Sequence, residues 1–457
     1  MVTTPTFGHL TDETLALFTD RYEIRMMEGY LAADHTPEAT FSLFFRTLPP
    51  NRGYVVAAGL EQVVAYLETL SFEERALSYL ADLDVSDDLL EFLADFSFSG
   101  EVRAVPEGTV VFPNEPLLEV TAPIEEAQLF ETVVINQIAY QSLIATKAAR
   151  MRDVVDREGE DQSLVDFGSR RAHGTDAGMK AGRAAYLGGF DGTSNLAAGE
   201  AFDVPVYGTM AHSWVQSFPT EDESFEAFVE VVGDDAVLLV DTYDTVNGTK
   251  TAVTVAEEAG VDLDGVRLDS GDLAALSKEV APIVGDTDVF ISSGMDEYAI
   301  AEFFEDGGIG DGFGPGTALV TSTDAPKLEG VYKLVAVEEN GEIVPSMKLS
   351  TGKVSYPGQK SVRRVESDDG FERDVLAARG EPGPGEEQLV TVFEDGERVH
   401  SLPDLDEIRA RRAEQVAALP LGVRALRDPT EYPVAVSDGL AETTESLRAD
   451  LEDRYLR

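Results

Sequence analysis

The feature that most constrains this chain is a series of short apolar segments that alternate with helical patterns. Each apolar segment ends in a polar or glycine-rich turn, and a helical pattern follows it after a few residues. The predicted strands are residues 163–167, 204–208, 236–241, 265–269, 288–292 and 317–322. The predicted helices are residues 176–187, 223–232, 249–259, 273–284 and 297–304. Strands that alternate with helices at intervals of roughly thirty residues indicate parallel β/α units. Six in a row predict a β/α barrel, although an open doubly wound sheet has the same pattern.

The segments on either side of this series have mixed patterns. Before it, apolar residues recur at helical spacing over residues 11–31 and strand patterns occupy residues 40–45 and 102–111, while a long helix is predicted over residues 124–155. After it, residues 330–400 indicate strands joined by tight turns, with Asn340-Gly341 and Asp395-Gly396 as hairpin positions and an exposed loop at 380–385. A helical tail broken by prolines follows residue 405. The predicted division is an N-terminal α/β domain (1–123), a barrel (124–329) and a β-rich segment with a helical tail (330–457).

The charge of the chain excludes several classes of partner. The 35 basic and 86 acidic residues give a formal net charge of −51. Such a surface repels nucleic acid and anionic membranes, so we expect neither as a partner. The excess could serve to bind cations or basic proteins, or it could be a solvated surface adapted to high salt. The acidic residues are spread along the whole chain, which favours the high-salt interpretation.

Three further observations concern the compartment. The chain has no cysteine, which rules out disulfides, thiol nucleophiles and cysteine-ligated zinc. No apolar stretch has the length of about 18 residues that a membrane span requires. The first 18 residues contain no Lys or Arg, unlike a secretory signal. We therefore expect a cytoplasmic protein.

Polar and glycine-rich runs lie at the carboxyl ends of the predicted strands, where the chemistry of a β/α barrel collects. The runs are DFGSRRAH (166–173), GTMAHS (208–213), DTYDT (241–245), RLDSGD (267–272), SSG (292–294) and GFGPGT (312–317). Glycine-rich turns before helices suit phosphate, because free N–H groups and the helix dipole converge there. Neighbouring carboxylates suit Mg²⁺, which bridges phosphate oxygens. The set predicts a phosphorylated, Mg²⁺-bound substrate.

Each of these elements also has a purely structural interpretation. A single glycine-rich turn is most often only a turn, and His173 or His212 alone is more often a packed or surface histidine. Arg267 and Asp269 could form a structural ion pair. The conjunction of such residues at successive strand ends is what favours a site.

A basic island is the second electrostatic signal. Residues 343–365 contain no acidic residue but five basic ones, namely Lys348, Lys353, Lys360, Arg363 and Arg364. In so acidic a chain they predict an anion-binding surface. The alternative is a strand edge protected by lysines. Lys353 lies in STGKVS, which lacks the spacing of an ATP-binding P-loop.

Several long motifs resemble one enzyme family nearly from end to end. They are LFTDRYEIRMMEGY, FRTLPPNRGYVVAAGLE, DFGSRRAHG, YGTMAHSWVQSF, LLVDTYDTVNG, GVRLDSGDL, TDAPKLEGVYKLV and YPGQKSVRR, in the family's order. On these motifs the chain resembles nicotinate phosphoribosyltransferase. The resemblance implies an irregular β/α barrel of the type II phosphoribosyltransferase kind, an N-terminal α/β domain, and a β-rich C-terminal segment. The implied reaction forms nicotinate mononucleotide and pyrophosphate from nicotinate and phosphoribosyl pyrophosphate.

The resemblance also implies a role for each matching residue in base binding. Tyr22 and Phe167 would hold the pyridine ring between them, and Arg267 would bind the nicotinate carboxylate. Family sites lie between subunits, so Asp20 and Tyr22 would come from the neighbouring chain of a homodimer or higher homo-oligomer.

Further implied roles concern ribose, phosphate and ATP. Arg170 and the turns Ser293-Gly294 and Gly316-Thr317 would hold ribose or its 5′-phosphate. Asp269 would lie near the ribose and the Mg²⁺-pyrophosphate, and Lys360 and Arg364 would contact phosphate. His212 would accept a phosphoryl group from ATP as co-substrate, with Asp241 orienting its imidazole. The cofactor implied is Mg²⁺; with no cysteine cluster, no zinc is expected.

Three other functions remain open on the sequence. One is a sister enzyme that uses nicotinamide, which lacks the carboxylate, or quinolinate, which has a second carboxylate and would need a larger basic cluster. Another is a non-catalytic nucleotide-binding regulator on the same barrel. The third is an acidic barrel enzyme of unrelated chemistry.

Overall fold

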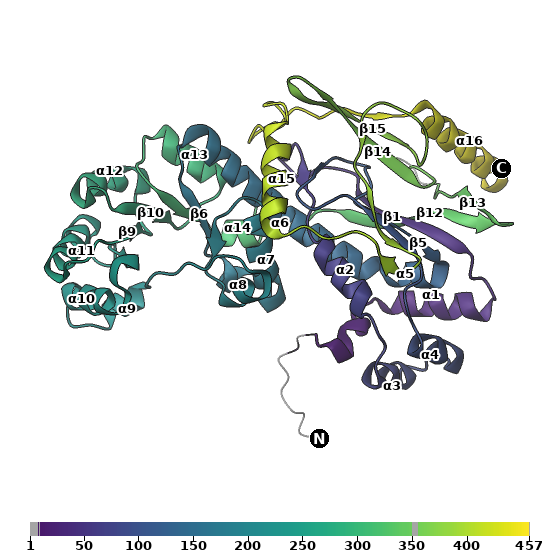
Figure 1. Cartoon of the computed structure of the whole chain (residues 1–457), viewed down its shortest axis with the longest axis horizontal. Helices are drawn as coiled ribbons and strands as arrows, with labels where there is room; N and C mark the ends of the chain where they lie inside the picture. The colour runs from purple at the N-terminus through teal and green to yellow at the C-terminus, as the bar shows by residue number, and fades with distance from the viewer. Residues whose placement is uncertain (1–7, 9, 350–354, 457) are drawn as a thin grey trace. The chain divides into compact units, whose positions relative to one another are not determined.

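The computed structural model describes residues 8, 10–349 and 355–456, which fall into two compact units. The first unit combines Met1–Ser142 with Lys327–Arg457, and the second is Leu143–Pro326. Figure 1 labels their helices and strands along the chain. Lys353 of the basic island lies outside the described residues. None of the described helices is long and apolar enough to cross a membrane.

The second unit is built on a parallel sheet of six strands in the order β7-β6-β11-β10-β9-β8. Their bounds are β6 Ser163–Asp166, β7 Gly192–Thr193, β8 Val237–Leu239, β9 Gly265–Leu268, β10 Asp288–Ser292 and β11 Gly312–Gly314. The last strand of the series, β11, pairs with the first, β6, through Gly312 with Ser163 and Phe313 with Leu164. In this order β7 and β8, which follow one another in the chain, lie at the two edges of the sheet, as they do in a barrel that is open at one seam. The strand order agrees with the predicted β/α barrel.

The barrel is irregular at one seam, between β7 and β8. The prediction of a strand at residues 204–208 is wrong. Within this segment, Val206 forms an isolated bridge to Thr193 and no strand. Pro205 has no N–H to donate, so it cannot extend a ladder. Across the seam, the Thr209 hydroxyl donates to the carbonyl of Val237 at 2.7 Å.

The strand predicted at residues 317–322 is also wrong. Those residues begin with a short helix, α14 (Thr317–Val320), and the barrel strand is the preceding β11, which reads Gly-Phe-Gly. Glycine has low strand propensity, so a search for apolar, β-branched runs passes over such a strand. The same reason explains why β7, a Gly-Thr pair, was not predicted.

Helices connect the barrel strands, and the five predicted helices are confirmed with small shifts of their ends. The helices after α6 are α7 Thr175–Leu187, α8 Leu196–Phe202, α9 His212–Gln216, α10 Glu221–Val232, α11 Thr245–Ala259, α12 Leu273–Val284 and α13 Glu297–Glu305, with 3-10 turns at η2 Ser169–Arg171 and η3 Gly233–Asp235. Helix α11 begins earlier than predicted because the Asp244 carboxylate caps it by accepting the N–H of Asn247. Helices α10 to α13 lie beside one another, and α11 and α12 pack on β9 and β10 (Figure 1).

A buried ion network ties helices α6 and α13 together within this unit. Glu297 of α13 is fully buried. Its Oε2 is ion-paired with Lys147 Nζ at 2.5 Å and its Oε1 accepts from Arg150 Nε at 3.0 Å, and both of these cations are on α6. Lys147 also contacts Asp324 at 2.8 Å. Removing one member of a buried pair costs about 3–5 kcal/mol, because the partner charge is left desolvated. The network therefore supports the barrel on the side of α13.

The first unit is built on a sheet that joins the two ends of the chain. Its strand order is β13-β12-β1-β5-β3-β17-β18, in which the central β1 pairs antiparallel with both β5 and β12. The bounds are β1 Glu38–Phe45, β3 Glu101–Ala104, β5 Leu118–Pro123, β12 Gly330–Glu339, β13 Glu342–Pro345, β17 Val390–Glu394 and β18 Glu397–Arg398. The residues after 326 thus share a core with the N-terminal segment.

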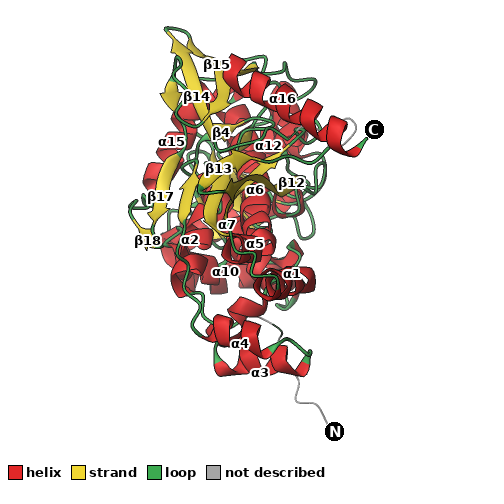
Figure 2. Cartoon of the chain, turned by 90° about the vertical axis from the view of Figure 1, so that its right-hand side faces the viewer, coloured by secondary structure: helices red, strands yellow, loops and turns green. Residues whose placement is uncertain are grey.

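Two smaller sheets complete the first unit. They have the orders β16-β14-β15-β19 and β2-β4. The bounds are β2 Val55–Val56, β4 Val110–Val111, β14 Lys360–Ser367, β15 Gly370–Ala378, β16 Glu386–Glu387 and β19 Val434–Val436. The tail helices are α15 Leu405–Ala417 and α16 Asp438–Tyr455, and α16 packs on β15 (Figure 2). Both predicted hairpin turns are confirmed, with positive φ at Asn340, Gly341, Asp395 and Gly396.

Three elements predicted as continuous in the first unit are interrupted. The helix predicted over residues 11–31 consists of a 3-10 turn, Asp12–Leu17, and helix α1, Arg21–Ala32. The predicted strand 102–111 is divided into β3 and β4 by a turn. The predicted helix 124–155 consists of α5 Ile124–Leu129 and α6 Glu131–Glu158, separated at the buried Phe130. The remaining helices are α2 Leu60–Thr69, α3 Glu74–Asp82 and α4 Asp87–Ala94.

Candidate active site

Four neighbouring strands, β6, β11, β10 and β9, bring an aromatic ring and a guanidinium to the carboxyl end of the barrel. Phe167 follows β6 and donates its N–H to the carbonyl of Pro315 at 2.9 Å. Its ring lies against β11 at Gly314, where a Cβ atom would be only 2.4 Å from the ring. Gly314 pairs with Ser292 of β10, and Arg267 on β9 pairs with Phe290 of β10. Glycine at 314 therefore lets the Phe167 ring lie flat beside this part of the sheet.

Arg267 is a largely buried cation beside that ring. Its Cζ is 5.9 Å from the centre of the Phe167 ring. Nη2 donates to the carbonyl of Met210 at 2.8 Å and Nη1 donates to the Ser292 hydroxyl at 3.3 Å, while the buried Nε has no partner. Burial lowers the pKa of Arg267, and the charge of Arg170 lowers it further. A buried guanidinium with an unused N–H suits an anion that is also planar.

Asp269 and Ser292 lie next to Arg267. The Ser292 hydroxyl is 2.6 Å from Asp269 Oδ1, and Arg267 Nη1 is 3.6 Å from the same oxygen. Ser292 is 2 % exposed. Arg267 and Asp269 therefore do not form a close structural ion pair. The Ser292 hydroxyl lies between the two groups and contacts both.

His212 is the first residue of α9 and its imidazole is partly exposed. Nδ1 is 3.1 Å from the Thr242 hydroxyl, a contact within hydrogen-bond distance. Nε2 faces two carboxylates, at 3.7 Å from Asp269 Oδ2 and 4.0 Å from Asp241 Oδ1. His212, Asp241 and Asp269 therefore lie close together, as the sequence predicts, although His212 follows an isolated bridge and not a strand.

The two carboxylate oxygens of Asp241 differ in their hydrogen bonding. Oδ2 accepts the N–H of Asp269 at 3.0 Å and the hydroxyl of Ser270 at 2.5 Å. Oδ1 is buried without a hydrogen-bond partner, although it faces His212. The residue within hydrogen-bond distance of the imidazole is Thr242, which sequence reasoning did not single out. The orienting role of Asp241 stays a prediction.

The predicted phosphate-binding turns are exposed at the same strand ends. Ser293 and Gly294 follow β10 with φ of 74° and 69°, and Gly316 precedes α14, which begins at Thr317. A positive φ is uncommon for residues other than glycine, so the backbone at Ser293 adopts a specific turn conformation. Arg170 lies in η2, is exposed and belongs to the same unit.

The remaining predicted site residues lie in the first unit. Asp20 immediately precedes α1, and its carboxylate accepts the Thr132 hydroxyl at 3.1 Å. Tyr22 is 46 % exposed. Partial burial and the neighbouring Glu131 raise the pKa of Tyr22, so its phenol stays protonated. Both residues are accessible at the surface of their unit.

Lys360 and Arg364, predicted to contact phosphate, are each 2 % exposed and already ion-paired. Lys360 Nζ is 3.0 Å from Glu119 Oε1, and Arg364 Nη2 is 2.5 Å from Asp374 Oδ2. Strand β14, which carries them, pairs on both sides, so it is not a protected edge either. A phosphate would have to displace these carboxylates, and the predicted contact stays a prediction.

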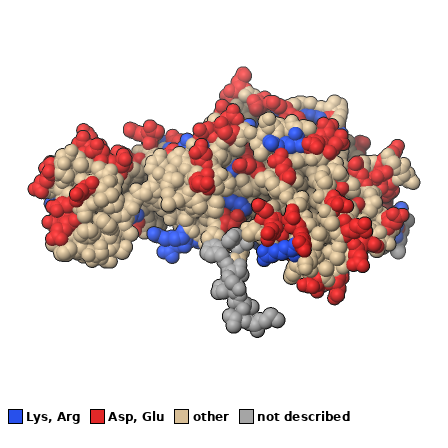
Figure 3. Space-filling view, turned by 60° about the horizontal axis from the view of Figure 1, so that its bottom comes forward, with Lys and Arg blue, Asp and Glu red and all other residues tan. Residues whose placement is uncertain are grey.

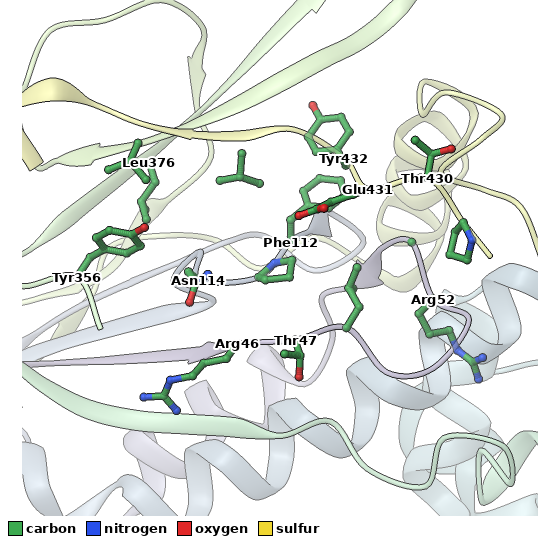
Figure 4. Close-up of a pocket in the computed structure, with 16 residues that line it drawn as sticks. Arg46, Thr47, Arg52, Phe112, Asn114, Tyr356, Leu376, Thr430, Glu431 and Tyr432 are labelled. Carbon is green, nitrogen blue, oxygen red and sulfur yellow. The ribbon is translucent and has the colours of Figure 1, made fainter. Parts of the chain in front are cut away.

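The first unit also contains a cavity of about 430 Å³ (Figure 4). Phe112, Tyr356, Leu376 and Tyr432 line it together with Arg46 and other residues. None of the predicted site residues lines this cavity. The candidate site is therefore separate from this cavity.

Among the described residues, no group of three or more His, Asp or Glu side chains is arranged to hold a metal ion. Mg²⁺ is usually bound by one or two carboxylates together with substrate phosphates, so it does not need such a group. The unpartnered oxygen of Asp241 and the nearby Asp269 fit that mode of binding.

Family comparisons agree with the site. The chain matches the nicotinate phosphoribosyltransferase N-terminal domain over residues 17–139, the nicotinate phosphoribosyltransferase family over 162–395, and the family's C-terminal domain over 384–444. It is 46 % identical over 443 residues to a nicotinate phosphoribosyltransferase of Mycobacterium tuberculosis, which covers 95 % of this chain and 94 % of the relative. It is 40 % identical over 464 residues to the Bacillus subtilis enzyme, covering 93 % and 94 %.

Solved structures agree as well. Human nicotinic acid phosphoribosyltransferase superposes with a TM-score of 0.83 at 30 % identity, covering 94 % of this chain and 99 % of that one. A nicotinate-nucleotide pyrophosphorylase of Pyrococcus furiosus shares the fold, with a TM-score of 0.73 at 24 % identity and coverage of 91 % and 100 %. These findings confirm the predicted fold class. With the family models matched along its length and the Phe167, Arg267 and His212 cluster at its barrel strand ends, this chain belongs to the nicotinate phosphoribosyltransferase family.

Proposed function

We propose that the chain transfers a phosphoribosyl group from phosphoribosyl pyrophosphate to the ring nitrogen of nicotinate, and that ATP drives the reaction through a phosphohistidine at His212. The observation that carries the proposal is Arg267. It is a buried cation beside the Phe167 ring, and its Nε has no partner among the described residues. A flat ring that carries one carboxylate complements this arrangement.

In the proposed complex, the pyridine ring lies on the face of Phe167 and its carboxylate accepts hydrogen bonds from Arg267. Tyr22 and Asp20 of a second copy complete the site, in a homodimer or a larger homo-oligomer. The exposure of Tyr22 supports this arrangement. A single buried arginine favours one carboxylate over the two of quinolinate.

The central step breaks the bond from ribose C1′ to the pyrophosphate oxygen, and pyrophosphate leaves with the bonding electrons. The lone pair of the pyridine nitrogen then forms the new bond to C1′, so no strong general base is needed. The protein's task is to align the base and stabilise charge. Asp269 would lie near the cationic ribose, and Arg170 with the turns at Ser293-Gly294 and Gly316-Thr317 would hold the 5′-phosphate. Mg²⁺, held by Asp241 or Asp269 together with phosphate oxygens, would neutralise the leaving pyrophosphate.

In the ATP half of the reaction, an imidazole nitrogen of His212 attacks the γ-phosphorus and ADP leaves with the electrons of the broken P–O bond. Water later hydrolyses the phosphohistidine and releases phosphate. The carboxylates that face Nε2 would stabilise the cationic imidazole. Partial exposure of His212 leaves it accessible to ATP.

The test measures product formation in molar KCl with Mg²⁺ and phosphoribosyl pyrophosphate, with nicotinate, nicotinamide or quinolinate supplied separately, each with and without ATP. We expect product from nicotinate, increased by ATP in the wild type but not in His212→Ala. Product from nicotinamide alone, or from quinolinate alone, would assign a sister reaction.

Binding of phosphoribosyl pyrophosphate without product from any base would overturn the enzymatic proposal and favour a regulator. Incubation with ATP labelled at the γ-phosphate separates the two halves of the proposal. Label that stays on the wild type in alkali, and is absent from His212→Ala, supports the phosphohistidine; unlabelled active enzyme overturns only that half.

A further inference from the structure

Ser292 makes three polar contacts at the centre of the site. It is the last residue of β10 and is almost completely buried. Its hydroxyl lies 2.6 Å from Asp269 Oδ1, 3.2 Å from the carbonyl of Leu268 and 3.3 Å from Arg267 Nη1. No role follows for this residue from the reaction proposed above.

A hydroxyl has one proton, so it can donate to only one of these partners at a time. The 2.6 Å contact has the length of an O–H···O⁻ bond to a carboxylate, so we place the proton toward Asp269. The hydroxyl oxygen then accepts the N–H of Arg267. Arg267 Nη1 and Asp269 Oδ1, which are 3.6 Å apart, are therefore joined through the serine and not by a direct hydrogen bond.

The position of the Ser292 hydroxyl between Arg267 and Asp269 has a consequence for each of these residues. On the arginine side, the hydroxyl lies between Nη1 of Arg267 and Asp269 Oδ1, while Nε of Arg267 has no partner among the described residues. On the carboxylate side, it engages Oδ1 and leaves Oδ2 facing His212 Nε2 at 3.7 Å. One hydroxyl thus fixes the orientation of both the cation and the carboxylate.

We propose that Ser292 is a positioning residue that links base binding at Arg267 to the use of ATP at His212, through Asp269. The link rests on the function proposed above. When the carboxylate of the base engages Arg267, the serine transmits the change to Asp269, which faces the imidazole. Without the hydroxyl, Asp269 turns toward Arg267, competes with nicotinate for the guanidinium and leaves the imidazole.

A purely structural serine would behave differently. The contact with the Leu268 carbonyl alone would make Ser292 a residue that ties β10 to β9, and its loss would lower stability only. Base selectivity and the response to ATP are readouts that such a role would not change.

The experiment compares Ser292→Ala, Ser292→Thr and Ser277→Ala with the wild type. Ser277 is a buried serine in α12 of the same unit. Among the described residues, its hydroxyl bonds only the backbone of Ala274 and Ile309. The measurements are the KM for nicotinate without ATP, the ratio of nicotinate to nicotinamide turnover, and the number of ADP molecules formed per nucleotide. For Ser292→Ala we expect about a tenfold rise in KM, the scale of one hydrogen bond to a charged group, together with a lower selectivity.

We also expect more ADP per nucleotide in Ser292→Ala, because ATP use is no longer tied to base binding. Ser292→Thr keeps the hydroxyl and should restore all three values, whereas Ser277→Ala should leave them unchanged. Unchanged KM and selectivity in Ser292→Ala would overturn the proposal. A raised KM with an unchanged ADP ratio would overturn the link to His212.

The proposed function and the proposed role of Ser292 can be disproved separately. If the wild type is active without ATP and ATP has no effect, the phosphohistidine and the link to it are both wrong, but the KM and selectivity measurements still test the bridge to Arg267. If the wild type forms no nucleotide, the proposed function itself is wrong. The wild-type assay therefore comes first.

Discussion

At the scale of single residues, burial separates arginines with different roles. Arg364 is buried against Asp374, which raises its pKa despite the cost of burial. Arg267 is also buried, and the charges of Asp269 and Asp241 offset the effect of burial only in part, so its pKa is lowered. A buried charge is costly unless it is paired, and a site whose charge awaits a partner is a candidate for ligand binding. This difference favours Arg267 over Arg364 as the cation for the proposed anionic ligand.

Arg267→Ala tests this conclusion. Because the substitution removes the charged hydrogen bonds to the carboxylate, we expect kcat/KM for nicotinate to fall about 100-fold. Nicotinamide has no carboxylate, so its turnover should fall much less. Steady-state kinetics with both bases checks the prediction, with Arg75→Ala, which removes an exposed pair with Glu13, as control. Equal losses for both bases would contradict the role given to Arg267.

A second residue-scale prediction concerns Glu115 in the first unit. Burial, followed by the charge of Asp374, raises the pKa of Glu115 well above its ordinary value of 4.5. A raised pKa in the folded state means that stability is greatest below the unfolded-state pKa and falls as pH rises through the folded-state pKa. Glutamine mimics the protonated form. Glu115→Gln should therefore be more stable than the wild type at pH 8 by about 1 kcal/mol or more, and nearly equal to it at pH 4.5.

Thermal unfolding of both proteins between pH 4.5 and pH 8 measures this difference. The exposed Glu372→Gln serves as the matched control and should keep the wild-type slope. A fall in Tm with pH that is identical in Glu115→Gln and the wild type would show that Glu115 is ionised in the folded protein.

At the scale of elements, the site depends on a strand with almost no side chains. Strand β11 reads Gly-Phe-Gly, and its Gly314 faces the ring of Phe167. Ser292 lies on the neighbouring strand at the same level. The absence of a side chain at Gly314 gives the aromatic ring its place next to the polar cluster.

Gly314→Ala should disturb the base site directly. The added methyl would lie 2.4 Å from the Phe167 ring, so the ring must move. We expect the KM for nicotinate to rise about tenfold, with a loss of stability of about 1–3 kcal/mol from overpacking. The control is Gly330→Ala in β12, where the nearest atom to the added carbon lies 3.7 Å away, an ordinary contact. An unchanged KM would show that the ring position does not set base affinity.

At the scale of the whole molecule, charge dominates the surface. Figure 3 shows Asp and Glu spread over the face in view with few Lys and Arg between them. The formal charge is −51, and the substrates proposed here are anionic as well. Like charges repel both within the folded protein and between protein and substrate, and salt screens them.

Raising KCl from about 0.1 M to about 1 M shortens the Debye length from about 10 Å to about 3 Å. We therefore expect Tm to rise by about 5 °C or more and the KM for phosphoribosyl pyrophosphate to fall. Thermal unfolding and initial rates across the KCl series measure both effects. An uncharged osmolyte at equal osmolality should not lower the KM, since it screens no charge. Lower stability in molar KCl would contradict the high-salt interpretation.

The sequence by itself determined the class of fold and most of the barrel elements, because alternating strands and helices leave a periodic apolar pattern. It failed where that pattern is weak. Gly-Phe-Gly has too few apolar side chains to be recognised as a strand, and Pro205 prevents a strand that the surrounding residues favour. Sequence motifs also placed His212, Asp241, Arg267 and Asp269 in one site, since the ends of parallel strands converge.

Only the tertiary structure decided which polar groups satisfy one another. Lys360 and Arg364 look like surface cations in the sequence, but their partners Glu119 and Asp374 come from strands that only folding brings beside them. Ser292 and Thr242 look ordinary for the opposite reason, because a hydroxyl acquires its importance from the groups placed around it. Chain order fixes which residues end a strand, whereas burial and the few ångströms between side chains determine whether a charge is satisfied or left for a ligand.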